Sequence, residues 1–300
     1  MAIPDQLYSK TTFPRTVALS VLTLSIFLSA TNAGLIINEL FRGNNDEQNY
    51  VEFLVTSDLT LLELDGIWFG DSRANTRDIS RERNFNSAEI ISNSSYFSTT
   101  ADVVKAGTFL TVGGSQVTTD FTYNPNSTTP NDSDSWNITL QNGSGFGSGG
   151  GGPSLFNINR NGEVIWVSSS RPSDGAGTSD FISAIALDSN PGTLALEVET
   201  IAQSGNEAFQ LVTGADFDGR ISRGNSLSNL NGEAVDFSGS ETAGGSLGVA
   251  TAGSINNSNF AYDLRAVPEP SAIIPALFVI ALGFFFATRS LRGASTTEAI

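Results

Sequence analysis

The residue types in this chain restrict the chemistry it could perform. The 300 residues include no histidine and no cysteine, so a Ser-His-Asp triad, a thiolate nucleophile, a disulfide and a cysteine-ligated metal site are all excluded. The formal net charge of −16 repels nucleic-acid phosphates, and we therefore expect no nucleic-acid partner. An enzyme built from this chain would have to use carboxylates, lysine, tyrosine or a bound ion.

Two acidic stretches invite comparison with calcium-binding loops. The stretch DFDG at 216–219 begins like an EF-hand, which needs a glutamate at position twelve, but that position is Leu227. Asp132 and Asp134 fail in the same way, because Gly143 stands at their position twelve. Aspartates are common in ordinary turns, where their side chains bond nearby backbone groups. We therefore expect no cofactor, and weak calcium binding between loops is the alternative.

Glu39 and Glu52 lie in two short apolar runs, LIINEL and YVEFLV. A glycosidase needs two carboxylates about 5–10 Å apart across a cleft, but the sequence alone selects no such pair. We interpret both glutamates as strand residues that face solvent or bond to neighbouring backbone. Trp68, Trp136 and Trp166 could stack on sugar rings, although such residues more often fill a core.

The elements that would position these residues are short and β-rich. Besides LIINEL and YVEFLV, the stretch AGTFLTVGG at 106–114 predicts a strand, and TLALEVETI at 193–201 alternates in the way of a strand. The stretch SLFNINRNGEVIWVS at 154–168 predicts a hairpin with Asn161 and Gly162 at its turn. Residues 34–266 show no capped helical period, so we expect an all-β fold, a sandwich or a barrel.

The N-terminus is typical of a secretory signal peptide. Lys10 and Arg15 precede a short apolar run at 16–28, and small residues follow as far as Ala33. We expect a signal helix over residues 1–33 that is cleaved after Ala33. An uncleaved anchor is the alternative, but the run is shorter than the roughly 20 residues that span a bilayer.

A second apolar run near the C-terminus predicts a transmembrane helix. Residues 271–288 carry no charge, and about 27 Å of helix just crosses the hydrocarbon core. Arg289 and Arg292 follow at once, which places the C-terminus in the cytoplasm and the preceding domain outside. A buried core helix is the alternative interpretation.

The order of these C-terminal features resembles a known sorting signal. The motif consists of Val267, Pro268, Glu269, Pro270 and Ser271. Followed by the apolar run and the two arginines, it resembles the PEP-CTERM signal. The resemblance implies recognition by an exosortase, a membrane-embedded enzyme of bacteria that make extracellular polysaccharide. It also implies processing near Pro268–Pro270, a transient inner-membrane anchor, and release or transfer of the domain to the cell surface or matrix. In this chain the basic residues are spaced rather than adjacent, and a tail follows them.

The first part of the exported region resembles a second family. The stretches IINEL at 36–40, YVEF at 50–53 and LDGIWF at 64–69, with Asp46 between the first two, are similar to the start of a lamin-tail-like domain. This resemblance implies an immunoglobulin-like β-sandwich, here with long loops. It concerns the fold and carries no chemistry with it.

These features divide the chain into segments. We expect a signal peptide at 1–33, a β-sandwich at 34–240, a flexible spacer at 241–266, the sorting signal at 267–292 with its membrane segment at 271–288, and a cytoplasmic tail at 293–300. The glycine-rich stretch 143–152 marks a flexible break, after which either insertions or a second β-unit would follow.

The sequence therefore predicts an exported, exosortase-processed surface or matrix protein that is not an enzyme and presents an acidic β-domain to extracellular polysaccharide. A carbohydrate-binding module, with or without bound calcium, is the alternative. A carboxylate-based hydrolase is a third hypothesis.

Overall fold

The computed structural model describes residues 34–73, 82–126, 135–141, 156, 158, 163–171, 180–187, 193–206, 208–212, 220–229, 237, 241–245, 261 and 263–265. All of them belong to the unit Asn32–Ile300. The expected signal helix and transmembrane helix lie outside the described residues. Within the part of the chain that is described, no helix has the length and apolar character needed to span a membrane.

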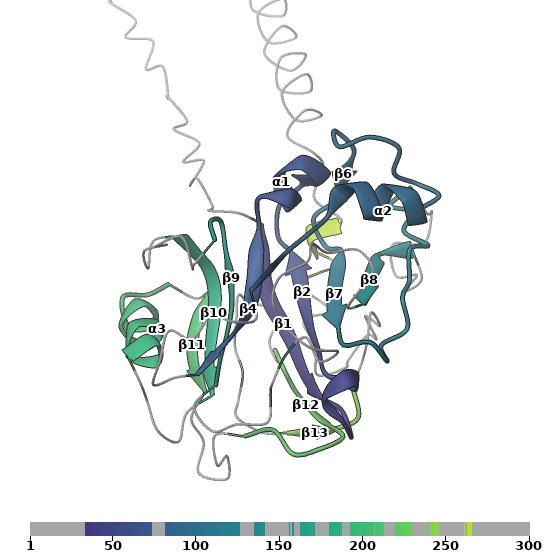
Figure 1. Cartoon of the computed structure of the whole chain (residues 1–300). Helices are drawn as coiled ribbons and strands as arrows, with labels where there is room; N and C mark the ends of the chain where they lie inside the picture. The colour runs from purple at the N-terminus through teal and green to yellow at the C-terminus, as the bar shows by residue number, and fades with distance from the viewer. Residues whose placement is uncertain are drawn as a thin grey trace, which may run out of the picture. The chain divides into compact units, whose positions relative to one another are not determined.

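The larger sheet contains strands from both ends of the described chain (Figure 1). Its order is β13-β12-β1-β2-β7-β8. All neighbours are antiparallel except β7 and β8, which are parallel. The strands are β1 (Leu35–Arg42), β2 (Tyr50–Val55), β7 (Phe109–Gly113), β8 (Asn137–Gln141), β12 (Asn225–Ser228) and β13 (Thr242–Ala243).

The second sheet has the order β11-β10-β9-β4-β5, with β10 and β11 parallel. Its strands are β4 (Trp68–Arg73), β5 (Arg83–Asn84), β9 (Glu163–Ser168), β10 (Phe181–Leu187) and β11 (Phe209–Val212). A small two-stranded sheet joins β3 (Leu59–Thr60) to β6 (Val103–Val104). Each large sheet therefore contains strands that precede the glycine-rich stretch 143–152 and strands that follow it.

The main core lies between the two large sheets. The ring of Phe53 on β2 lies 6.0 Å from that of Phe69 on β4 and 6.3 Å from that of Phe85. Because side chains alternate along a strand, Val51 and Val55 share this inner face with Phe53. The backbone of Ile37 on β1 also donates to the hydroxyl of Ser183 on β10, at 3.3 Å. The fold is mostly β, and the strands predicted at LIINEL, YVEFLV and 106–114 are confirmed.

The prediction of a strand over 193–201 is wrong, because these residues begin the helix α3 (Thr193–Gln203). The parallel strands β10 and β11 need a crossover connection, and a helix supplies it. Val198 is buried, and Ile201 and Ala202 pack beside it against the outer face of the second sheet. The spacing of these three residues follows the helical period, which the alternation of the preceding residues obscures.

The expectation that residues 34–266 lack helices is wrong at other positions too. The structure has the short helices α1 (Leu61–Asp65) and α2 (Ser87–Asn93) and a 3-10 turn, η1 (Asp46–Gln48). In α1, Thr60 and Glu63 form a capping box, which the T-x-x-E spacing encodes.

The hairpin predicted over 154–168 is also wrong. Its second arm is β9, but β10 and β4 occupy both edges of that strand, which leaves no edge for a hairpin partner. Phe156 and Ile158 are instead buried in the main core outside any strand. Asn161 and Gly162 lie outside the described residues.

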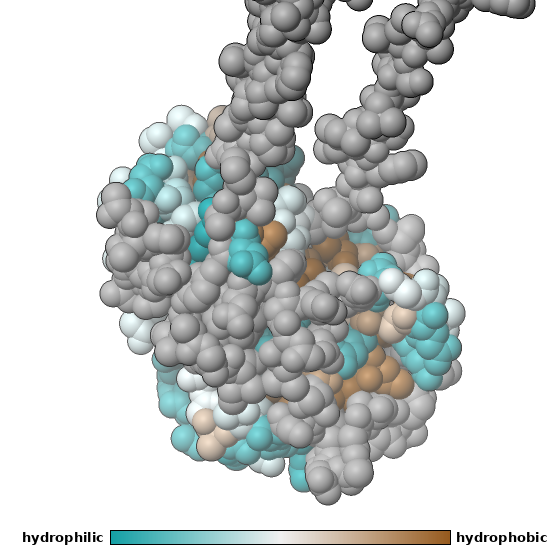
Figure 2. All heavy atoms as spheres, turned by 180° about the vertical axis from the view of Figure 1, so that it is seen from behind, coloured by the Kyte–Doolittle hydropathy of each residue, from teal (hydrophilic) through white to brown (hydrophobic). Residues whose placement is uncertain are grey.

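The described surface agrees with the polar composition of the chain. On the face shown in Figure 2, hydrophilic residues cover most of the described surface, and apolar residues show as patches among them. Among the described residues, Leu62 on α1 is the exposed large apolar side chain, with 64% of its surface accessible.

Candidate functional site

The residues of the sorting signal lie outside the described part of the chain, as do the expected cleavage residue Ala33 and the orienting residues Arg289 and Arg292. The segment immediately before the signal is described. Ala261 and residues 263–265 are helical, and Arg265 stands only two positions before Val267. How this segment attaches to the sheets is therefore the geometry closest to the sorting motif.

Arg265 is held on the fold by its guanidinium group. Its Nε donates to the backbone oxygen of Gly107 at 2.8 Å. The guanidinium carbon lies 4.8 Å from the ring centroid of Trp136 and 5.6 Å from that of Phe109 at the start of β7. Cation–π contacts of this kind contribute about 0.5–1 kcal/mol each when exposed and about 2 when desolvated. Ala261 is fully buried beside this contact, and Leu264 packs against the main core.

Gly107 makes the close approach of this segment feasible. Its φ of +86° lies in the left-handed region that favours glycine. A Cβ atom there would also lie 2.6 Å from the backbone oxygen of Ala261 and 2.5 Å from Cγ of Arg265. Any side chain at position 107 would therefore push the segment away from the sheet.

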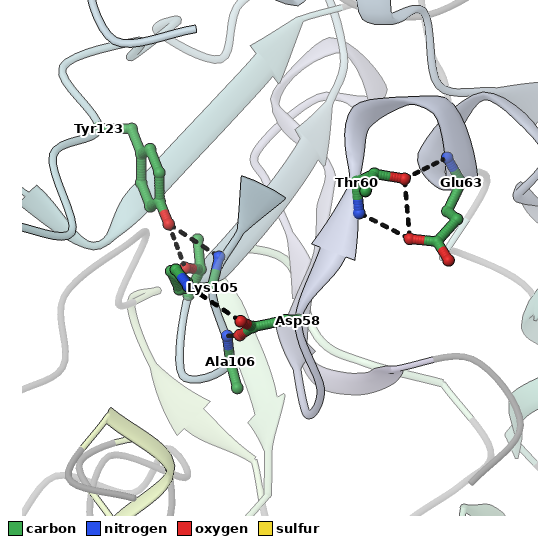
Figure 3. Close-up of polar contacts among 7 residues, drawn as sticks. Asp58, Thr60, Glu63, Lys105, Ala106 and Tyr123 are labelled. Carbon is green, nitrogen blue, oxygen red and sulfur yellow. Dashed lines mark hydrogen bonds and ion pairs between the residues drawn. The ribbon is translucent and has the colours of Figure 1, made fainter. Parts of the chain in front are cut away.

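The loop that carries Gly107 is braced from both sides (Figure 3). Asp58 forms an ion pair with Lys105 at 3.1 Å and accepts a hydrogen bond from the backbone of Ala106 at 2.9 Å. On the other side, the hydroxyl of Tyr123 accepts from the backbone nitrogen of Lys105 at 2.8 Å and from the hydroxyl of Thr108 at 3.4 Å. Burial raises the pKa of Tyr123 far above its ordinary value, so the phenol stays protonated.

The capping box drawn in Figure 3 fixes the chain just after Asp58. The backbone nitrogen of Thr60 donates to the carboxylate of Glu63 at 2.7 Å, and that of Glu63 donates back to the Thr60 hydroxyl at 3.2 Å. This reciprocal pair holds the start of α1, and with it β3, in one conformation.

Trp136 is positioned by an aromatic cluster. Tyr123 stacks on Phe97 with ring centroids 5.1 Å apart and meets Trp136 edge-on at 6.5 Å. Trp136 is only 6% exposed, and its indole nitrogen is buried without a hydrogen-bond partner among the described residues. The surface that receives Arg265 is therefore held by contacts within the domain as well as by Arg265 itself.

We expected Glu39 and Glu52 to be strand residues that face solvent or bond to neighbouring backbone; both lie in strands, but neither faces solvent, and the hydrogen bonds described below come from side chains. The two glutamates are directly opposed on β1 and β2, and both are fully buried. Glu52 accepts hydrogen bonds from the amide of Asn38 at 2.7 Å and the hydroxyl of Thr111 at 3.3 Å. Glu39 accepts from the hydroxyl of Tyr50 at 3.2 Å. Their contacts are those of a buried polar layer in the sheet, which also includes Ser228 and Thr139 on the flanking strands β12 and β8.

The three tryptophans occupy different environments. Trp166 is fully buried in the outer core of the second sheet, where α3 packs, and Trp136 belongs to the docking surface described above. Trp68 is half-buried, and the guanidinium of Arg171 lies 5.1 Å from its ring centroid while pairing with Glu82. One face of the Trp68 ring is therefore already covered.

The acidic stretches considered for calcium, Asp132 and Asp134 as well as 216–219, lie outside the described residues. Among those that are described, no group of three or more acidic side chains is arranged to hold a metal ion.

The sequence predicts a sorting motif at 267–271 but does not reveal the residues that hold the chain next to it. Arg265 carries no motif, and its partners lie far away in the sequence at 107–109 and 136. The signal available was Gly107, a glycine near the start of the stretch 106–114 that was predicted as a strand; a glycine inside a strand pattern often marks a close approach of backbone. Comparison with protein-family models, with curated proteins and with solved structures found no match to this chain.

Proposed function

We propose that this chain is an exported protein whose sorting signal is processed by an exosortase-type enzyme, leaving an acidic, mostly-β domain at the cell surface or in the extracellular matrix. The observation that carries the proposal is the order of parts at the C-terminal end. The described fold ends at Arg265, docked on the domain, and the motif at 267–271, the uncharged run at 271–288 and the two arginines follow directly.

The proposed role is presentation of the domain rather than catalysis. Glu39 and Glu52 are buried and hydrogen-bonded inside a sheet, where a substrate does not reach them. Three tryptophans were considered as residues that could stack on sugar rings. Trp136 and Trp166 are buried, and the guanidinium group of Arg171 covers one face of the Trp68 ring. These contacts favour a scaffold over a hydrolase or a carbohydrate-binding module.

For the fold we propose a lamin-tail-like, immunoglobulin-like sandwich. The residues that carry the resemblance form β1, β2 and the start of β4, which lie in two sheets packed on one core. The two parallel pairs, β7 with β8 and β10 with β11, are additions to the antiparallel arrangement of that family.

Processing can be tested in a bacterium that carries an exosortase and in the same strain without it. We expect the full-length chain to be shortened only where the enzyme is present, and a triple variant Pro268→Ala, Glu269→Ala, Pro270→Ala to stay full-length. Immunoblotting of membrane and extracellular fractions measures both size and location. Identical size and location in the two strains would overturn the proposal.

A further inference from the structure

The docked segment places the fold within a few residues of the sorting motif. We define the latch as Ala261, Leu264 and Arg265, and its receptor as Gly107, Phe109 and Trp136. At most about 3.6 Å per residue separates successive positions of an extended chain, so Pro268 lies within about 11 Å of Arg265. While the latch is closed, Ala266 and Val267 are the only residues between the docked segment and the Pro-Glu-Pro sequence.

Resting on the proposed function, we propose that the latch competes with the processing enzyme for the same stretch of chain, so that the closed latch slows processing. Enzymes and domains that recognise an extended peptide use main-chain groups of successive residues. Residues 263–265 are helical, and Arg265 is fixed by three contacts. They cannot occupy an extended binding cleft until the latch opens.

The contacts of Arg265 set how often the latch opens. Its guanidinium group contacts two aromatic rings and a backbone carbonyl at once, and the receptor is rigid because Asp58 and Tyr123 brace the Gly107 loop. Removing that side chain removes all three contacts and leaves the receptor intact. The open population, and with it the processing rate, should then rise by about tenfold or more.

The test combines a processing rate with a structural readout. Pulse-chase labelling in the exosortase-carrying strain measures the rate for the wild-type chain and for Arg265→Ala. Amide hydrogen exchange on the purified full chain in detergent measures protection at 261–266. Gly107→Ala opens the latch from the receptor side, since its Cβ would overlap Arg265 and Ala261. Arg171→Ala removes a comparable arginine–tryptophan contact on the other sheet and serves as the matched control.

We expect Arg265→Ala and Gly107→Ala to lose exchange protection at 261–266 and to be processed about tenfold faster, while Arg171→Ala matches the wild type in both measurements. A wild-type segment that exchanges without protection would overturn the latch. Loss of protection in Arg265→Ala with an unchanged or slower processing rate would overturn the competition. If no variant, including the wild type, is processed while 261–266 stays protected, the proposed function fails and the docking stands.

Discussion

The buried glutamate layer gives the sharpest stability prediction. Glu52 is fully buried, and it accepts hydrogen bonds from Asn38 and Thr111 while standing opposite Glu39. Glu52→Ala leaves both donors without this acceptor, at about 1 kcal/mol or more each, and removes one buried methylene group worth about 0.8 kcal/mol. Glu52→Gln keeps an oxygen for Asn38 and an amide that can donate to the Thr111 hydroxyl.

The comparison of these two variants isolates the hydrogen bonds. Both variants lack the carboxyl group that faces Glu39, so any electrostatic effect of removing that group is common to them and cancels. We expect the alanine variant to be less stable than the glutamine variant by about 3 kcal/mol, or by roughly 6–12 °C in Tm for a domain of this size.

Thermal and urea unfolding followed by tryptophan fluorescence measures this difference on the full chain. Leu62→Ser changes an exposed side chain and should stay within about 0.5 kcal/mol of the wild type. Alanine and glutamine variants within about 1 kcal/mol of each other would refute the assignment of Glu52 as the central acceptor of the layer.

Three further predictions concern the loops around the latch. Hydrogen bonds from two backbone N–H groups hold the pKa of Asp102 below its ordinary 3.8. The stability that the Asp102 carboxylate contributes is therefore present above pH 3.8 and is lost as the pH falls through the lowered pKa. Asp102→Asn should lower Tm at pH 7 and match the wild-type Tm in strong acid, and an equal difference in Tm at both pH values would contradict this. Thr60→Ala should lower the free energy of unfolding in urea by about 1 kcal/mol, because the backbone N–H of Glu63 loses its capping oxygen. Thr60→Ser keeps that oxygen and should leave the stability close to that of the wild type. An equal loss of stability in both variants would refute the capping role. Tyr123→Phe removes the hydroxyl that accepts a hydrogen bond from the backbone N–H of Lys105, and it should lower the free energy of unfolding by about 1–2 kcal/mol. It should also raise amide hydrogen exchange in the loop that carries Lys105. Unchanged exchange would argue against the brace.

The sequence predicted those strands in which β-branched and aromatic residues are dense and turn residues stand at both ends. In β2 and β7, β-branched and aromatic residues are dense and turn residues bound them, so local pattern and final structure agree. At α3 the same reasoning failed, because the parallel pairing of β10 and β11 requires a crossover that no local pattern reveals. The alternation at Leu194 and Leu196 does not exclude a helix. The helical spacing of apolar residues that pack on the sheet becomes visible only at Val198, Ile201 and Ala202.

Local patterns also could not predict that Glu39 and Glu52 are buried or that the C-terminal segment docks on the domain. The sequence shows Glu39 and Glu52 only as acidic residues in two separate strands, and only the pairing of β1 with β2 brings them together in a buried layer. Arg265 contacts residues more than a hundred positions away. The proposed sorting motif at 267–271, by contrast, is a linear pattern, so the prediction of it needs no contact between distant residues.

The most direct test of the account is the mass of the mature protein recovered from cells that carry the processing enzyme. We predict a polypeptide that begins at Gly34 and ends within 267–271, so that it keeps Arg265 and loses the apolar run and both arginines. A recovered chain that still ends at Ile300, or one that ends before Ala261, would contradict processing at the motif beside a docked latch.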